Sequence, residues 1–441
     1  MILTRKDALK ELIIFSLPII FGHVGLMLVG TGDMIIAGRY SKECLAAIGL
    51  AISIANPIMM LGIGLQMAIS PWLAQQRGKG EDVGKYFWSV MIFSLLIGLV
   101  TCLLTLLSIE LIPFFNYGEK LSLIMKDYLF ITSFSTFGIN LYQGLKEFLQ
   151  SQEKAIAANV IAFMAAGLNL VLNYCFVFGD YNFPQLHEVG LAWASLSVRL
   201  FMGGALFIVA ATFVKYVFSI EKNFFKEVMK LGMPISITVF FEVLAFCSVT
   251  LFVGKFGELQ TAANNIALNL ASLSFMLPLS ISSAVSVKIG HAFGEKNIPK
   301  IKTFLEVSLF TSFLCTGIMA SAFYFLPHFA LGFYSTDVDV LHVGRLILFW
   351  VACFQLFDGA QVTLSGILRG VSVTLPSFLA NFAGYWIIGI PLGYYLGFKD
   401  NMQAEGFWIG LAISLASVAI SLALILKIKM KNLELEYAKV N

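Results

Sequence analysis

Three acidic side chains lie alone inside long apolar stretches of this sequence. Asp33 occurs in GTGDMIIAG, Glu242 in VFFEVLAF and Asp358 in LFDGAQVTLSG. A charged side chain near the centre of a bilayer costs at least about 2.5 kcal/mol, so it normally faces a cavity or a partner and marks function. Desolvation disfavours the ionised carboxylate, and a bound proton or cation removes that penalty. The three acids are therefore candidates for binding a coupling ion in competition with a cationic substrate.

A structural ion pair is the alternative explanation for each acid. Arg199 is the only Lys or Arg placed well inside an apolar stretch, and one arginine cannot neutralise three carboxylates. The nearest preceding base to Glu242 in the sequence, Lys230, is about 18 Å away along a helix, too far for its side chain to reach the acid. We therefore favour the functional interpretation for all three acids.

Amide and aromatic side chains are spaced so that they can complete these sites. Asn169 and Asn173 are four residues apart and project from one helix face, which predicts a polar patch with Asp33. Amides within a bilayer also hydrogen-bond neighbouring helices simply as glue, and that alternative stays open. Phe246 follows Glu242 by one helical turn and offers a ring face to a cationic ligand.

All of these residues lie in apolar stretches that are long enough to form membrane-spanning helices. Of the 441 residues, 59% are hydrophobic and only 12% are charged, against roughly 25% charged in ordinary soluble domains. A spanning helix needs roughly 20 apolar residues. About twelve such stretches can be placed, which predicts an all-α polytopic membrane protein with no room for a soluble catalytic domain. The stretches are 12–37, 45–72, 86–110, 124–148, 157–178, 188–214, 230–255, 262–288, 303–326, 341–368, 375–397 and 405–427.

The basic residues are unequally divided between the two sides of these stretches. Most of the 29 Lys and Arg residues, among them Lys146, Lys288 and Arg369, lie on the side of the two termini. The opposite side carries Arg39, Lys42, Lys120, Lys126, Lys255, Arg345 and Lys399. By the positive-inside rule we expect both termini to be cytoplasmic. The net charge of +3 is too small to suggest a nucleic-acid partner.

An internal repeat appears when the chain is shifted by 216 residues. LKELIIFSLPI at 9–19 then lies over FKEVMKLGMPI at 225–235, and Gly38 meets Gly254. Each copy holds six spans, an even number, so the copies are parallel. We expect two six-helix bundles, residues 1–218 and 219–441, around a cleft that opens to either side by rocking.

Enzymes and channels fit the sequence less well than a transporter does. It contains no zinc-ligand spacing, P-loop, G-x-S-x-G or dinucleotide fingerprint. A membrane-embedded transferase needs a His/Asp pair or an acid cluster near one interface, and the isolated His23 supplies neither. A flippase for lipid-linked oligosaccharide needs several inward-facing bases, for which Arg199 is the only candidate. We expect no enzymatic activity and no bound cofactor besides a coupling ion.

The sequence resembles the multidrug and toxic compound extrusion (MATE) transporters, in particular their bacterial NorM-like branch, over essentially its full length. The matching segments are SLPIIFGHVGLMLVGTGDMIIAG (16–38), MLGIGLQMAISPWLAQQRGKG (60–80), GLNLVLNYCFVFG (167–179), MPISITVFFEVLAF (233–246), AANNIALNLASLSFMLPLSISSAVSVKIGHAFGE (262–295) and FDGAQVTLSGILRG (357–370).

The resemblance implies a fold, an activity and a set of site residues. It implies two six-helix lobes around a V-shaped cleft, and a monomer that exports amphipathic organic cations in exchange for Na⁺ or H⁺. Glu242 and Asp358 match the family's cation site in the second lobe, which also binds drugs. Asp33, Asn169 and Asn173 match its polar site in the first lobe.

Three further positions follow from the same resemblance. Asp337 matches an outer-cleft acid that contacts cationic drugs. Asn265 lies where a glutamine often lines the drug site. Phe354 occupies a position where sodium-coupled members carry a tyrosine, which puts one oxygen ligand for Na⁺ in doubt.

Overall fold

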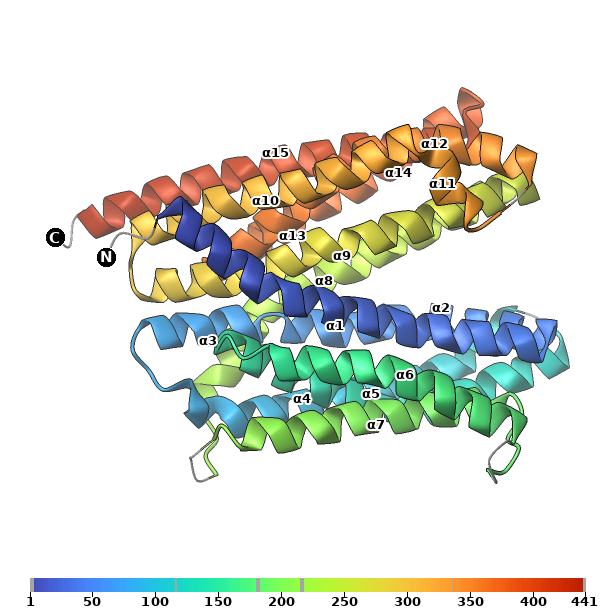
Figure 1. Ribbon diagram of the computed structural model, residues 1–441, viewed down its shortest axis with the longest axis horizontal. Helices are drawn as coiled ribbons and strands as arrows, with labels where there is room; N and C mark the ends of the chain where they lie inside the picture. Colours follow the sequence, from blue (N-terminus) through green and yellow to red (C-terminus); the bar gives the residue numbers. More distant parts are fainter. Residues whose placement is uncertain (1–3, 116, 180–182, 215–217, 336, 439–441) are drawn as a thin grey trace. The chain divides into compact units, whose positions relative to one another are not determined.

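The structure is a computed structural model that describes residues 4–115, 117–179, 183–214, 218–335 and 337–438. Over these residues the chain is almost entirely helical and contains no β-strand, as predicted (Figure 1). The elements in chain order are α1 (Arg5–Tyr40), α2 (Lys42–Gln66), α3 (Ile69–Gly78), η1 (Val83–Tyr86), α4 (Phe87–Ser108), η2 (Ile109–Phe115), α5 (Glu119–Ser151), α6 (Ile156–Phe178), α7 (Val189–Ala211), α8 (Lys222–Val253), η3 (Gly254–Phe256), α9 (Glu258–Gly294), α10 (Ile298–Phe325), α11 (Pro327–Gly332), α12 (Val338–Gly370), α13 (Leu375–Phe382), η4 (Ala383–Gly389), α14 (Ile390–Tyr394), η5 (Tyr395–Lys399) and α15 (Gln403–Ala438).

Eleven helical segments among the described residues are long and apolar enough to cross a membrane. They coincide with eleven of the twelve predicted stretches. The remaining stretch, 124–148, is helix α5, which is long enough but more polar than the others. Many polar side chains of α5 lower its average hydropathy. They are turned into the protein, so they are not exposed to lipid. The buried members of this set include Thr132, Ser133, Thr136, Asn140 and Gln143.

The helix boundaries follow the internal repeat. The segment Lys42–Gly78 and helix α9, Glu258–Gly294, each contain 37 residues and are related by the shift of 216. Helices α5 and α12 each contain 33 residues. Helices α1 and α8 both carry an internal proline, Pro18 and Pro234, at equivalent positions. The repeat therefore governs where helices begin and end as well as which residues recur.

The chain divides into two compact units. The N unit comprises Leu17–Arg77 and Glu81–Ser236, and the C unit comprises Met1–Ser16, Gly78–Gly80 and Ile237–Asn441. Helices α1 and α8 each contribute to both units, and each changes unit within two residues of its proline. Proline removes one backbone hydrogen bond and weakens a helix at that point. A division into lobes at residues 218 and 219 remains a prediction from the repeat.

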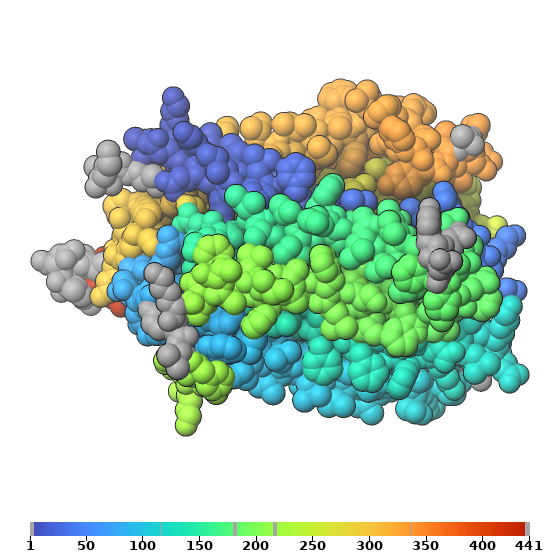
Figure 2. Space-filling view, turned by 60° about the horizontal axis from the view of Figure 1, so that its bottom comes forward, coloured from blue at the N-terminus to red at the C-terminus, as the bar shows by residue number. Residues whose placement is uncertain are grey.

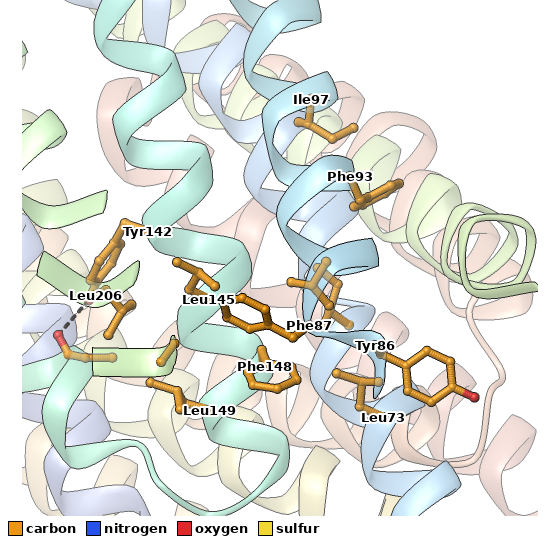
Figure 3. Packing of buried hydrophobic residues seen from close by; sticks show 14 of the residues in the cluster. Leu73, Tyr86, Phe87, Phe93, Ile97, Tyr142, Leu145, Phe148, Leu149 and Leu206 are labelled. Atoms are coloured by element: carbon orange, nitrogen blue, oxygen red, sulfur yellow. Dashed lines mark hydrogen bonds between the residues drawn. The ribbon is translucent and has the colours of Figure 1, made fainter. Parts of the chain in front are cut away.

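Each unit has its own apolar core. In the N unit, aromatic and branched side chains from α3, α4, α5 and α7 interlock, and the Tyr142 hydroxyl donates a hydrogen bond of 3.0 Å to the Ala158 carbonyl (Figure 3). In the C unit, Phe354, Tyr385 and Trp408 are among the largest buried side chains. Tyr385 donates a hydrogen bond to Glu242, and Phe354 is one turn before Asp358, so the core of the C unit also forms the wall of a candidate site.

The outer surface of the N unit is strongly apolar along α6 and α7. Phe163, Val171 and Ile208 are all more than half exposed. Figure 2 shows the continuous face that these two helices present. Exposed apolar side chains over the length of a span are typical of contact with lipid acyl chains.

Candidate functional site

The N unit brings Asp33 together with both predicted amides. Asp33 on α1 is 2% exposed. Its Oδ1 accepts hydrogen bonds from Asn169 Nδ2 at 2.9 Å and Asn173 Nδ2 at 2.7 Å, both on α6. Its Oδ2 accepts one of 2.8 Å from the Ser195 hydroxyl on α7. The structure thus places the three residues together, as predicted. Ser195 is a fourth member of the patch that the sequence did not reveal.

Two glycines on α1 allow this close arrangement. A Cβ atom added at Gly25 would lie 2.9 Å from the backbone of Ala162 on α6, and one at Gly32 would lie 2.8 Å from the Asn169 Oδ1. Helices α1 and α6 therefore approach more closely than larger residues permit. This contact holds Asp33 within hydrogen-bonding distance of the amides.

Arg199 forms no ion pair with Asp33, although it is close enough to interact with it electrostatically. Its Nη1 donates a hydrogen bond of 2.8 Å to the Ser135 hydroxyl and lies 3.4 Å from the Met59 sulfur. Asp33 forms no ion pair with any residue that the structure describes. The buried Asp33 carboxylate is thus held by hydrogen bonds from three neutral donors, and Arg199 adds a favourable charge interaction.

The C unit holds a second acidic site, in which Glu242 and Asp358 lie near Tyr385. Glu242 on α8 is partly buried, and its Oε1 accepts a hydrogen bond of 3.2 Å from the Tyr385 hydroxyl on η4. Asp358 on α12 is 4% exposed and close enough to Glu242 to interact with it electrostatically. Among the described residues, Asp358 has no hydrogen-bond or ion-pair partner. The C site, defined as Glu242, Asp358 and Tyr385, thus contains a buried carboxylate with unused acceptor capacity.

Aromatic rings enclose the C site. Phe246 is one turn after Glu242, and its ring centroid lies 6.1 Å from those of Phe354 and Tyr385. Phe354 packs edge-on against Trp408 at 5.4 Å. The predicted proximity of Phe246 to the acids is present, and Phe354 supplies a ring and no oxygen atom.

An irregular helix positions Tyr385. Residues Ala383–Gly389 form a π-helical segment, η4, which follows α13. A Cβ atom at Gly384 would clash with the Val418 side chain, and one at Gly389 would lie 2.9 Å from the Ser414 Cβ on α15. The glycines let this segment lie directly on α15. Single π-helical turns frequently occur at functional sites, and here the turn directs the Tyr385 hydroxyl toward Glu242.

The structure places the two remaining predicted residues outside both acidic sites. The Asn265 side chain is exposed, and its backbone carbonyl accepts a hydrogen bond from Asn269. Its neighbour Asn264 is fully buried and accepts a hydrogen bond of 3.0 Å from Trp408 Nε1. Asp337 is the exposed N-cap of α12, and its Oδ1 accepts from the backbone N–H groups of Asp339 and Val340. Asp337 thus has a structural role that the sequence analysis did not predict.

Several basic residues are more deeply buried than the sequence suggests. Lys146 on α5 is 3% exposed, and its Nζ lies 3.4 Å from His23 Nε2. His23 is therefore not isolated, and Arg199 is not the only base inside the protein. Lys288 forms an ion pair of 3.1 Å with Glu11, and Arg369 donates a hydrogen bond of 2.8 Å to the Ser282 hydroxyl. From the sequence Lys146, Lys288 and Arg369 could be assigned only to the side of the termini, because a sequence shows no tertiary partner.

The chemistry of the C site suits a proton or a hard cation. Two carboxylates and a phenol are hard oxygen ligands, which favour alkali and alkaline-earth ions over transition metals. Among the described residues no group of three or more His, Cys, Asp or Glu side chains is placed to hold a metal ion. A protonated organic cation is attracted by the same carboxylates and by the neighbouring ring faces.

The chain matches known proteins in sequence and in fold. The family model described as MatE matches residues 18–175 and 234–395. A mutant of a MATE transporter from Vibrio cholerae superposes with a TM-score of 0.88 at 16% identity, covering 97% of this chain and 98% of that one. A transporter of the MOP superfamily from Pyrococcus furiosus gives a TM-score of 0.85 at 22% identity, covering 98% and 97%. A eukaryotic MATE transporter gives 0.85 at 18% identity, covering 97% and 98%. At these identities the structural likeness shows the fold alone.

Proposed function

Because the chain belongs to the MatE family of membrane transporters, we propose that it is a secondary active antiporter for amphipathic organic cations. It exports them in exchange for H⁺ or Na⁺ by alternating access. The observation that carries this proposal is the C site. There the buried Asp358 carboxylate lies near the hydrogen-bonded pair Glu242 and Tyr385 and has no hydrogen-bond or ion-pair partner of its own among the described residues. Two carboxylates that form no ion pair with a described residue give the site an excess of negative charge, and any cation that enters stabilises it.

The exchange follows from competition for the two carboxylates. A proton or alkali ion bound at Glu242 and Asp358 reduces their negative charge and weakens their attraction for an organic cation. Loss of that ion restores the negative charge, and an organic cation then binds. A ligand shifts a conformational equilibrium only by its differential affinity for the two states. We propose that the two occupants favour opposite access states, which couples their movements in opposite directions.

Among the two coupling ions we favour the proton. A sodium ion needs several oxygen ligands, whereas a proton needs one acceptor atom. The C site offers the oxygens of Glu242, Asp358 and Tyr385. Phe354 contributes a ring packed against Trp408 and no side-chain oxygen, so it adds no ligand for Na⁺. Asp33 in the N unit is a second protonatable group of the same cycle.

The substrate class follows from the surroundings of the acids. Phe246 presents an aromatic face beside Glu242, and such faces attract cations while also packing against apolar groups. We propose that Asn265 and the outer acid Asp337 contact the substrate before or after it occupies the C site. The protein acts as a monomer in a bacterial inner membrane, with both termini in the cytoplasm.

The test is transport by purified protein in proteoliposomes. Efflux of a fluorescent organic cation is measured under an imposed proton gradient alone and then under a sodium gradient alone. The proton gradient is expected to drive efflux, and Glu242→Gln is expected to abolish it while the folded protein stays in the membrane. Efflux by the Gln variant at the wild-type rate would contradict the assignment of Glu242.

A flippase for lipid-linked oligosaccharide is the alternative with an observation in its favour. Lys146, Lys288 and Arg369 are buried, and an anionic pyrophosphate carrier requires such bases. However, Lys288 is paired with Glu11, Arg369 contacts Ser282, and Lys146 lies beside His23. These bases already have partners, whereas Asp358 does not, so we favour a cationic substrate. Translocation of a labelled pyrophosphate lipid without cation efflux would reverse this choice.

A further inference from the structure

A pocket of about 400 Å³ lies in the C unit, away from the C site. It is formed where the end of α10, the start of α11, the first turns of α12 and the start of α15 meet at one end of the bundle (Figure 1). Its lining combines aromatic rings with one basic and one acidic side chain: Tyr324, Phe325, Phe349, Trp350, Arg345 and Glu405.

Three polar side chains of this pocket have no partner among the residues that the structure describes. Arg345 and Glu405 line the same cavity without forming an ion pair, and neither side chain makes a hydrogen bond with any described residue. The Tyr324 hydroxyl is also without a partner among those residues. Charged groups at a membrane boundary are stabilised by ionic or hydrogen-bonding partners. The pocket therefore offers one site for an anion and one for a cation.

The apolar part of the pocket continues onto the outer surface of the helices. Phe325 is 73% exposed, Tyr324 is 56% exposed and Phe349 is 42% exposed. The Tyr324 ring lies 4.9 Å from that of Phe325 and 6.0 Å from that of Phe349. In a helix that spans a bilayer, such a cluster of exposed rings is a contact surface for lipid acyl chains.

The depth of the charged groups matches the headgroup region. Tyr324 and Phe325 form the last turn of α10, and Glu405 lies in the first turn of α15. Arg345 is only about 10 Å along α12 from its first residue, Val338. Helix ends with aromatic and basic residues are typical of the membrane interface. All members of the pocket therefore lie at the same interface.

We propose that this pocket binds the headgroup of a phospholipid with a primary amine, phosphatidylethanolamine. Arg345 binds the phosphate, Glu405 binds the ammonium group, and the exposed rings contact an acyl chain. An anionic lipid satisfies Arg345 but is repelled by Glu405. An organic cation satisfies Glu405 but is repelled by Arg345. A zwitterionic headgroup satisfies both, and a primary ammonium group, unlike choline, also donates a hydrogen bond to Glu405. Its acyl chains distinguish the lipid from a soluble zwitterion.

Competitive lipid retention tests the proposal on the full-length protein. The protein is placed in nanodiscs with equal amounts of phosphatidylethanolamine, phosphatidylcholine and phosphatidylglycerol, and the lipids that remain after mild detergent extraction are quantified by native mass spectrometry. We expect phosphatidylethanolamine to be enriched roughly tenfold over the other two lipids. Only its headgroup can donate a charge-assisted hydrogen bond from an ammonium group to Glu405. Arg345→Gln and Glu405→Gln are each expected to remove this enrichment.

Two further variants keep the test decisive. Lys120→Gln removes an exposed ion pair with Glu43 elsewhere on the chain, and its lipid retention should equal that of the wild type. The double exchange Arg345→Glu with Glu405→Arg keeps both charges, so it should retain the preference for phosphatidylethanolamine. Equal retention of the three lipids by the wild type, or a preference for phosphatidylglycerol lost only in Arg345→Gln, would overturn the proposal. Neither outcome depends on the transported substrate.

Discussion

The two acidic sites each contain a buried aspartate, but the two carboxylates differ in how many hydrogen bonds they accept. In the N unit, Asp33 accepts three hydrogen bonds from neutral donors. In the C unit, Asp358 accepts none from the described residues, although it is 4% exposed. Burial alone therefore does not identify an exchange site. What distinguishes the C site is acceptor capacity that the protein itself leaves unused.

The difference arises from the helices that face each acid. Asp33 faces α6 and α7, which supply two amides and a hydroxyl at close range because glycines allow α1 to approach. Asp358 faces aromatic side chains and a phenol whose hydrogen bond goes to Glu242. We infer that the C site binds the exchanged cations directly. We propose that Asp33 acts by changing its hydrogen bonds between access states.

The largest expected effect separates the two acids in transport. Asp358→Asn should lower cation efflux roughly a hundredfold, since losing one partner of a buried charge contact costs about 3 kcal/mol. Asp33→Asn keeps an acceptor oxygen for the α6 amides and should lower efflux by roughly tenfold or less. Both variants are compared in proteoliposomes at equal protein density. Equal losses would remove the functional distinction between the two sites.

Stability should change in the reverse order. Asp33→Ala leaves the donors of Asn169, Asn173 and Ser195 buried without their acceptor, at an expected cost of about 3 kcal/mol in the free energy of unfolding. Asp358→Ala removes a buried carboxylate that has no hydrogen-bond or ion-pair partner among the described residues, so stability should be unchanged or higher. Thermal unfolding in a fixed detergent measures both. A larger loss for Asp358→Ala would mean that its carboxylate has a structural partner.

The sequence predicts the Asp33 patch better than it predicts the C site. Asn169 and Asn173 share a helix face by their spacing, and a lone acid in an apolar stretch needs such partners. Ser195 and Tyr385 carry no comparable signal, because single hydroxyls are frequent in apolar helices. The π-helical turn that directs Tyr385 toward Glu242 depends on contacts with α15, which no local pattern encodes. The helices themselves are predictable because apolar length and the repeat determine them.

Helix approach in the N unit provides a third test. Gly25→Ala places a methyl group 2.9 Å from the backbone of α6, so α1 must move and the Asp33 hydrogen bonds must lengthen. We expect a loss of about 2 kcal/mol in stability, as for other overpacked contacts. Gly204→Ala is the matched control, because a Cβ atom there has no neighbour within 4 Å. Equal stability of the two variants would show that α1 does not depend on close contact with α6.

The smallest expected effect concerns an acid that belongs to neither site. Asp337 caps α12 by accepting hydrogen bonds of 2.9 and 3.2 Å from backbone N–H groups. Asp337→Ala should destabilise the protein by about 1 kcal/mol, whereas Asp337→Asn, also a good N-cap residue, should be nearly neutral. Efflux separates the cap from a direct contact with substrate, because both variants remove the negative charge. If Asp337→Asn weakens cation efflux at unchanged stability, then this exposed carboxylate contacts the substrate, and unused acceptor capacity no longer distinguishes the C site alone.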